Sequence, residues 1–250
     1  MSDLPALDCH AHVAPDVTGP QIRGLDGAHV FAVTRSLAEA AAASRRPRDE
    51  TVTWGLGIHP GLAAARALYN PKEFGRLLPQ FGLIGEIGLD REAGHLPQQT
   101  EILRGVLRQC QDQPVLLSLH SSGATAEIGE LLASHPHPGA ILHWYLGTPE
   151  QTRLVADTGA YFSVNAAMDD EAIAALPPER VLPETDFARP GRRGKKPGDT
   201  AALEARLTGI WQAQPSDVRH RCWANLRRVA VAAGALDRLA EATADLLVNV

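Results

Sequence analysis

Cysteine is scarce in this sequence, and the few cysteines present form no pattern. Cys9, Cys110 and Cys222 are odd in number and widely spaced, with no CxxC pair. Disulfide scaffolds and cysteine-based zinc sites are therefore excluded. We expect three reduced thiols.

Long apolar runs and an excess of positive charge are also missing. No stretch of about 18 apolar residues occurs, and the first residues lack the basic start and apolar core of a signal peptide. We therefore expect a cytoplasmic protein with no membrane partner. The net charge of -5 excludes a protein that coats nucleic acid through its overall charge, but not one with a local basic patch.

The arrangement of apolar segments predicts one α/β domain over residues 1–250. Short runs rich in Val, Ile, Leu and aromatics alternate with longer Ala-, Glu-, Arg- and Leu-rich segments, a pattern typical of a (β/α)8 TIM barrel. The expected strands are 6–13, 28–34, 52–59, 82–89, 115–120, 140–144, 160–164 and 181–186. The expected helices are 37–44, 97–111, 124–133, 148–158, 201–211, 217–230 and 236–247, with starts also indicated by Pro71, Pro97 and Pro149.

Histidines and acids gather at the carboxyl ends of the expected strands. In a barrel these ends converge on one face, where the loops form the active site. The residues concerned are His10 and His12 (first strand), His59 (third), Glu86 (fourth), His120 (fifth), His143 (sixth) and Asp186 (eighth). Their side chain types are those that bind divalent metals, and the pattern therefore predicts a metal site.

Each of these residues taken alone has an ordinary structural explanation. A His-x-His pair arises by chance, a strand-end histidine is more often a hydrogen-bonded rim residue, and an Asp such as Asp186 commonly caps a turn. Glu86 is different, because it lies inside the apolar run 82–89 and burying a carboxylate without a cation costs several kcal/mol. The prediction of a metal site therefore rests on the occurrence of all these residues at the ends of different strands. The other histidines match no motif and are expected in surface or packing roles: His29, His95, His135, His137 and His220.

In this order the motifs resemble the TatD family of metal-dependent deoxyribonucleases, within the amidohydrolase-like barrels. The matching segments are Asp8-Cys9-His10-Ala11-His12, Gly57-Ile58-His59-Pro60, Gly85-Glu86-Ile87-Gly88-Leu89-Asp90, the strand ending in His120, Leu142-His143, Tyr161-Phe162-Ser163-Val164-Asn165, Glu184-Thr185-Asp186 and Asn225-Leu226-Arg227-Arg228. The sequence departs from the family at Ser122, where an Arg is usual, and at His143-Trp144-Tyr145-Leu146-Gly147, where His-Cys-Phe-Ser-Gly is usual. These departures concern the substrate pocket. The His-Trp form is more similar to the TatD-like nuclease of the Qat anti-phage systems.

The resemblance implies two divalent metal ions, of which Zn²⁺, Mn²⁺ and Mg²⁺ are candidates. It implies that His10, His12 and Asp186 hold one ion, that His120 and His143 hold the other, and that Glu86 bridges both. The implied reaction is hydrolysis of DNA phosphodiester bonds from DNA ends by a metal-activated hydroxide. Asp186 would accept the water's proton, and His59 would contact the scissile phosphate or make only a structural hydrogen bond.

The segment after the eighth expected strand is basic. Residues 189–196 contain the cations Arg189, Arg192, Arg193, Lys195 and Lys196, which form either a contact for DNA or a solvated loop. Two other functions stay open. One is a binuclear hydrolase of a small amide, ester or phosphoester, and the other is a subunit of a defence complex that acts mainly as an interaction surface for protein partners.

Overall fold

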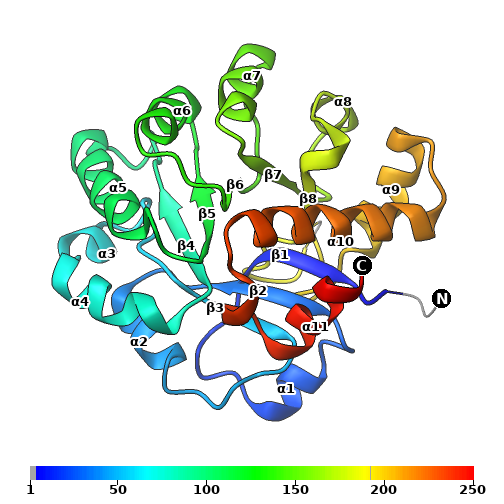
Figure 1. Ribbon diagram of the computed structural model, residues 1–250, viewed down its shortest axis with the longest axis horizontal. Coiled ribbons are helices and arrows are strands. Elements are labelled where there is room, and N and C mark those ends of the chain that lie inside the picture. Colours follow the sequence, from blue (N-terminus) through cyan, green and yellow to red (C-terminus); the bar gives the residue numbers. More distant parts are fainter. Residues whose placement is uncertain (1–3, 192) are drawn as a thin grey trace.

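Eight parallel strands form the centre of the computed structural model, which describes residues 4–191 and 193–250 (Figure 1). Each strand pairs with the next in sequence order. The strands are β1 (Leu7–His12), β2 (His29–Val33), β3 (Val52–Leu56), β4 (Leu83–Gly88), β5 (Leu116–His120), β6 (Ala140–Leu142), β7 (Tyr161–Val164) and β8 (Val181–Pro183). Their residues are almost all buried, as in sheets that are covered by helices. The predicted barrel fold is confirmed.

Helices connect the strands and surround them on the outside (Figure 1). The α-helices are α1 (Gly19–Arg23), α2 (Leu37–Ala43), α3 (Ala63–Ala67), α4 (Pro71–Leu77), α5 (Leu96–Cys110), α6 (Thr125–Ser134), α7 (Pro149–Asp157), α8 (Asp170–Ala174), α9 (Ala201–Trp211), α10 (Pro215–Ala232) and α11 (Glu241–Asn249). Short 3-10 helices are η1 (Leu78–Gln80), η2 (Pro178–Arg180) and η3 (Leu236–Arg238).

The barrel closes where β1 meets the segment after β8. The Asp186 amide donates to the His10 carbonyl over 2.8 Å, and the His12 amide donates to the Phe187 carbonyl over 2.8 Å. Ala11 and Phe187 form a parallel bridge between these hydrogen bonds. The first and last parts of the barrel therefore hold their polar side chains next to each other.

Two of the predicted helix starts have clear local causes. Pro71 is the first residue of α4, and the Asn70 side chain accepts a hydrogen bond from the Lys72 amide over 2.9 Å. Pro149 is the first residue of α7, and Thr148 caps that helix through its side chain. A proline at this position loses no hydrogen bond, since the first amides of a helix have no partner within it.

Three strands end two or three residues earlier than the sequence predicts. The expected strands 52–59, 140–144 and 181–186 end at Leu56, Leu142 and Pro183. At β3 the next amide, that of Gly57, donates to the Thr34 side chain over 3.0 Å instead of continuing the strand. As a result His59, His143 and Asp186 lie in the loops just past their strands.

The prediction of one helix over 236–247 is wrong. The segment divides into η3 and α11, separated by Leu239 in an extended conformation with ψ of 170°. The Ala240 amide donates to the Thr53 hydroxyl over 2.9 Å, so a contact with β3 fixes the break. The five-residue helices α1, α3 and α8 have no expected counterpart, because helices this short depend on tertiary contacts.

The three cysteines are buried in the core and form no disulfide within the described part of the chain. Among the described residues, no helix combines the length and apolar character needed to cross a lipid bilayer.

Candidate active site

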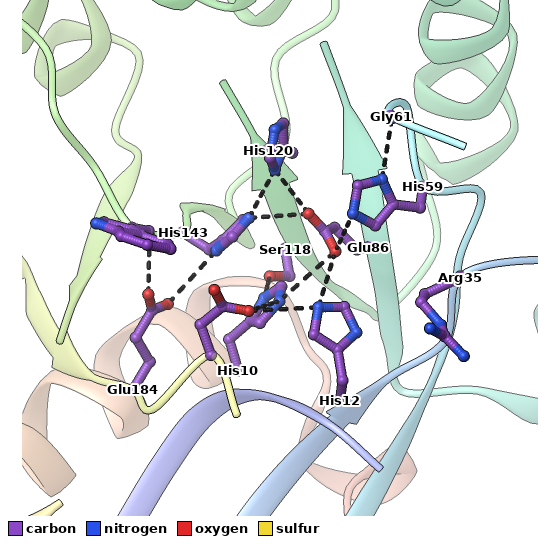
Figure 2. A network of polar contacts seen from close by, with 12 residues as sticks. His10, His12, Arg35, His59, Gly61, Glu86, Ser118, His120, His143 and Glu184 are labelled. Atoms are coloured by element: carbon purple, nitrogen blue, oxygen red, sulfur yellow. Dashed lines mark hydrogen bonds and ion pairs between the residues drawn. The ribbon is translucent and has the colours of Figure 1, made fainter. Parts of the chain in front are cut away.

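Glu86 lies at the centre of the predicted metal site, and one of its carboxylate oxygens, Oε2, faces the end of β1 (Figure 2). Oε2 of Glu86 lies 3.3 Å from Nε2 of His12 and 3.8 Å from Nε2 of His10. The same two imidazole nitrogens lie 3.3 Å and 3.8 Å from Oδ1 of Asp186. The two imidazoles thus lie between the Glu86 and Asp186 carboxylates, and His10, His12 and Asp186 together offer one group of potential ligand atoms.

The other carboxylate oxygen of Glu86, Oε1, faces the ends of β5 and β6. Oε1 lies 2.7 Å from Nδ1 of His120 and 3.0 Å from Nε2 of His143. The other ring nitrogens of these histidines face carboxylates: His120 Nε2 lies 3.3 Å from Asp90 and His143 Nδ1 lies 3.8 Å from Glu184. Each oxygen of Glu86 therefore serves a different group of histidines, which is the arrangement of a bridging ligand.

These groups have more ligand atoms than hydrogen-bond partners. Glu86 is 1% exposed and His10 is fully buried. Among the described residues, two atoms that face the centre, His10 Nε2 and Glu86 Oε2, find no hydrogen-bond partner. Such unpaired buried atoms are costly unless a cation binds them. Imidazole and carboxylate ligands in this number suit a transition-metal divalent ion, so the residues present fit the predicted metals.

Burial and mutual charge set the protonation of the site. Burial opposes ionisation of the Glu86 carboxyl, but the His143 charge and the hydrogen bonds from His120 and His143 outweigh it and hold the Glu86 pKa well below its usual value. Burial lowers the pKa of His10, with the His143 charge adding to the effect, and burial also lowers the pKa of His12. Both are thereby kept neutral, the form that binds metal.

His59 lies in the loop after β3, and a backbone hydrogen bond sets its tautomer. The Gly61 amide donates to Nδ1 of His59 over 2.9 Å, so the ring proton of neutral His59 is on Nε2. That nitrogen lies 3.3 Å from Oε2 of Glu86. A protonated nitrogen donates hydrogen bonds and does not coordinate a metal, so this geometry favours His59 as a donor to an anion.

The glycine of the Gly57-Ile58-His59-Pro60 motif is required by close packing. A Cβ on Gly57 would lie 1.8 Å from the Thr34 carbonyl oxygen and 2.5 Å from the Glu86 amide. Gly57 thus lets the β3 end approach both neighbours. This approach brings His59 and Glu86 into contact.

Asp8 is a fully buried carboxylate that the sequence analysis quoted in a motif without assigning it a role. It accepts hydrogen bonds from the Thr185 amide over 2.9 Å, the Thr185 hydroxyl over 2.5 Å and the Gly198 amide over 2.8 Å. Burial raises its pKa to about 6 against the effect of these donors. Asp8 holds the segment that carries Asp186 against β1. Its position two residues before His10, on the same face of β1, was the sequence feature that could have identified it.

Glu184 is a second buried acid that sequence reasoning left without a role. It accepts hydrogen bonds from the Trp144 amide over 3.0 Å, the Asn165 side-chain amide over 3.0 Å and the Ser163 hydroxyl over 2.5 Å. It also faces His143 Nδ1. It is a buried acid directly after β8, within the run 181–186 that was expected to be a strand, and this signal could have identified it. Carboxylates in this position orient ligand histidines.

Two cations of the basic segment 189–196 have defined partners, and they point in different directions. Arg193 forms an ion pair with Oδ2 of Asp186. Lys196 instead donates to the Gly24 carbonyl over 2.7 Å and pairs with Asp26 near α1. Arg192, also part of the predicted patch, lies outside the described residues. Among the described cations of this segment, Arg193 is thus the one that pairs with a proposed metal ligand.

A cavity of about 520 Å³ opens beside the site, within the size range of ligand pockets. Its lining includes His12, Val13, Ile22, Phe187 and Lys196. A larger cavity of about 770 Å³ lies near the start of β3 and η3, at the other end of the barrel, and the proposed ligands are not part of its lining. The smaller cavity is therefore the one that adjoins the chemistry.

The family profile described as TatD related DNase matches residues 7–230. The chain belongs to this family. Membership makes it a hydrolase, and the suspected resemblance is confirmed. Among solved structures, a TatD homolog from Escherichia coli superposes with a TM-score of 0.77 at 19% identity, covering 90% of this chain and 97% of the other. A TatD family hydrolase from Entamoeba histolytica gives a TM-score of 0.73 at 14% identity, with coverages of 91% and 99%.

Curated relatives of the TatD family are similar at lower coverage. The 3'-5' ssDNA/RNA exonuclease TatD of Citrobacter koseri is 27% identical over 150 residues, which are 52% of this chain and 58% of that protein. The protein of the same name from Erwinia billingiae is 24% identical over 220 residues, or 78% of this chain and 84% of that protein. The match thus spans less than two thirds of the Citrobacter protein and most of the Erwinia protein.

Proposed function

We propose that this chain is a metal-dependent nuclease that hydrolyses DNA phosphodiester bonds from strand ends. The observation that carries the proposal is the placement of Glu86, whose two oxygens face two separate groups of ligand side chains. Family membership and the names of the curated relatives support nucleic acid as the substrate.

The proposed ligands divide as their distances from Glu86 suggest. His10, His12 and Asp186 would hold one ion, His120 and His143 the other, and Glu86 would touch both. The bound ions would supply a water of lowered pKa as the nucleophile and positive charge beside the phosphate oxygens. The many imidazole donors favour Zn²⁺, Mn²⁺, Co²⁺ or Ni²⁺, although Mg²⁺ is also to be tested.

Two further side chains handle protons and the phosphate. Oδ1 of Asp186 faces His10 and His12, and we propose that Asp186 accepts the proton of the attacking water. His59 presents its Nε2 proton to the centre, where it would donate to an oxygen of the scissile phosphate. Glu86, Asp186 and His59 are thus the proposed catalytic residues.

The test is hydrolysis of end-labelled single-stranded DNA by metal-stripped protein reloaded with each ion. Mn²⁺, Zn²⁺, Co²⁺ and Mg²⁺ are supplied separately, and bound metal is measured by mass spectrometry in the same samples. We expect stepwise shortening of the strand, which labels at either end will assign to one direction. If metals are bound and the strand stays intact with every ion, the nuclease proposal is wrong.

A role in anti-phage defence is the finer part of the proposal. It is supported by the similarity of His143-Trp144 to the TatD-like nuclease of the Qat systems. Expression of the Asp186→Ala variant beside its native neighbouring proteins separates catalysis from scaffolding. Loss of phage resistance with unchanged assembly is expected of a nuclease. Preserved resistance would favour the chain as an interaction surface.

A further inference from the structure

Trp144 and Arg193 pack against each other beside the proposed metal centre. The Arg193 guanidinium carbon lies 4.7 Å from the centroid of the Trp144 ring, within the range of a cation–π contact. Trp144 directly follows the proposed ligand His143, and its amide donates to Glu184 over 3.0 Å. The aromatic ring is therefore positioned by the same residues that position His143.

Arg193 contacts both this aromatic ring and Asp186, a proposed ligand on the other side of the centre. Its guanidinium forms an ion pair with Asp186, and a quarter of its side chain is exposed. The short bridge between Gly191 and Gly194 closes the loop that carries it. The cation thus lies between a partly exposed aromatic face and a proposed metal ligand.

We propose that Trp144 and Arg193 together bind one nucleotide of a single-stranded substrate, a proposal that rests on the nuclease function above. The Trp144 ring stacks on the base, and the Arg193 guanidinium pairs with an adjoining phosphate. Proteins that bind single strands combine these two elements, a cation for the backbone and an aromatic platform for the base.

Metal binding at Asp186 would cause Arg193 to exchange the Asp186 carboxylate for a phosphate of the substrate. Without bound ions, the Asp186 carboxylate is the nearest anion to the guanidinium. When divalent ions occupy the centre, their charge opposes a neighbouring cation, and Arg193 then gains by pairing with a phosphate. Its departure uncovers the Trp144 face that it now covers.

The same reasoning predicts a preference for single strands. A base in a duplex is already paired and stacked on its neighbours, so it reaches Trp144 only after it is unpaired. A small residue at position 144, such as the family's usual Cys, offers no ring for stacking. The platform is therefore a property of this chain.

The experiment measures binding of fluorescein-labelled oligothymidylate with a phosphorothioate backbone, which resists hydrolysis, by anisotropy to the metal-loaded protein. A base-free chain of the same backbone and length is the matched probe. We expect the base-free chain to bind wild type at least about fivefold more weakly. Trp144→Leu should lose this discrimination, while Trp144→Phe should keep most of it. Oligothymidylate should quench wild-type tryptophan emission and do so less in Trp144→Phe.

Arg193→Ala is tested through the salt dependence of binding. Loss of one phosphate contact should reduce the slope of log affinity against log salt by about 0.7. Arg221→Ala is the control, because Arg221 packs on Trp211 in a similar contact, with 5.1 Å to the ring centroid, on the outer helices α9 and α10. Its slope should match that of wild type.

The outcomes separate the two proposals. Equal binding of both probes by wild type, or unchanged discrimination in folded Trp144→Leu, overturns the nucleotide contact even if the metal-loaded protein cleaves DNA. Binding that depends on Trp144 and Arg193, without hydrolysis under any metal, supports the contact and contradicts the nuclease.

Discussion

His10 and His143 lie face to face, with ring centroids 3.9 Å apart and ring planes inclined by 13°. They come from β1 and the loop after β6, and they belong to different proposed metal groups. Two charged imidazoles at this distance would repel each other strongly. The His143 charge accordingly lowers the pKa of His10 further than burial alone. At neutral pH the pair therefore carries one proton more than two neutral rings would, and hence a single positive charge.

That proton resides on His143, and metal binding must displace it. Burial disfavours the charged ring, but Glu86 and Glu184 outweigh burial and raise the pKa of His143 to about 10. We predict release of about one proton per chain on metal binding near neutral pH, with affinity increasing as pH rises toward 10. Calorimetry in buffers of different ionisation enthalpy measures the release. His143→Gln should release less, and a wild-type protein that releases none contradicts the prediction.

Replacing Glu86, the proposed bridging carboxylate, tests the proposed two-ion centre. Glu86→Gln keeps the shape of the side chain but removes the charge that faces both histidine groups. We expect metal affinity and nuclease activity to fall by more than about 100-fold, because residues that merely support ligands already cost about 10–100-fold. Metal content per chain and cleavage rate are the measurements. Glu204→Gln, which removes a carboxylate paired with Arg219 on α9, is the control and should retain both.

Glu184 should act through the position of His143. In Glu184→Gln, an amide NH2 faces donors such as the Trp144 amide and the Asn165 side chain, so the network loses acceptors. We predict metal affinity about 10–100-fold lower and a free energy of unfolding about 1–3 kcal/mol smaller. Metal titration and denaturant unfolding measure these effects. Excess metal should restore the cleavage rate, and activity that stays lost at full metal occupancy would argue for a direct role in the reaction.

A pH effect on stability is predicted far from the active site, at His29. Its ring bonds the Thr243 hydroxyl over 2.7 Å and packs edge-on against Trp223, and burial lowers its pKa from 6.5 to about 4. The unfolded chain therefore binds more protons between pH 6.5 and 4. Stability is full above pH 6.5 and falls by roughly 2–3 kcal/mol as the pH approaches 4.

The comparison variant for this prediction is His29→Gln, which can still bond Thr243 but does not titrate. Urea unfolding of both proteins in EDTA gives the difference in unfolding free energy at each pH. That difference should change across pH 6.5 to 4 and stay constant above it. A constant difference over the whole range would show that His29 contributes no pH dependence.

The barrel and the gathering of the proposed ligands at one end of it were predictable because each left a periodic or local signal. Eight apolar runs marked the strands, and Glu86 stood out as an acid inside one of them. His10 and His12 were two residues apart, which placed both side chains on the same face of β1. Strand ends in a barrel converge by topology alone. Knowledge of side-chain packing was not needed for any of these steps.

Other features depend on contacts between distant segments and left no such signal. The break before α11 exists because the Ala240 amide donates to Thr53, which lies 187 residues away in the sequence. The sequence alone does not indicate that Arg193 pairs with Asp186 while Lys196 pairs with Asp26. A run of similar charges predicts a solvated or basic surface, and only the folded loop decides which cation faces the site.

The seam between β1 and the segment after β8 has a consequence for synthesis of the protein in the cell. His10 and His12 leave the ribosome early, whereas Asp186 and the Gly198 amide that helps hold Asp8 leave late. A growing chain therefore has an incomplete set of proposed ligands until the segment that carries Asp186 and Gly198 has been translated. Metal capture and hydrolytic competence should both appear only after that point, so truncated chains released earlier would be harmless to nucleic acid.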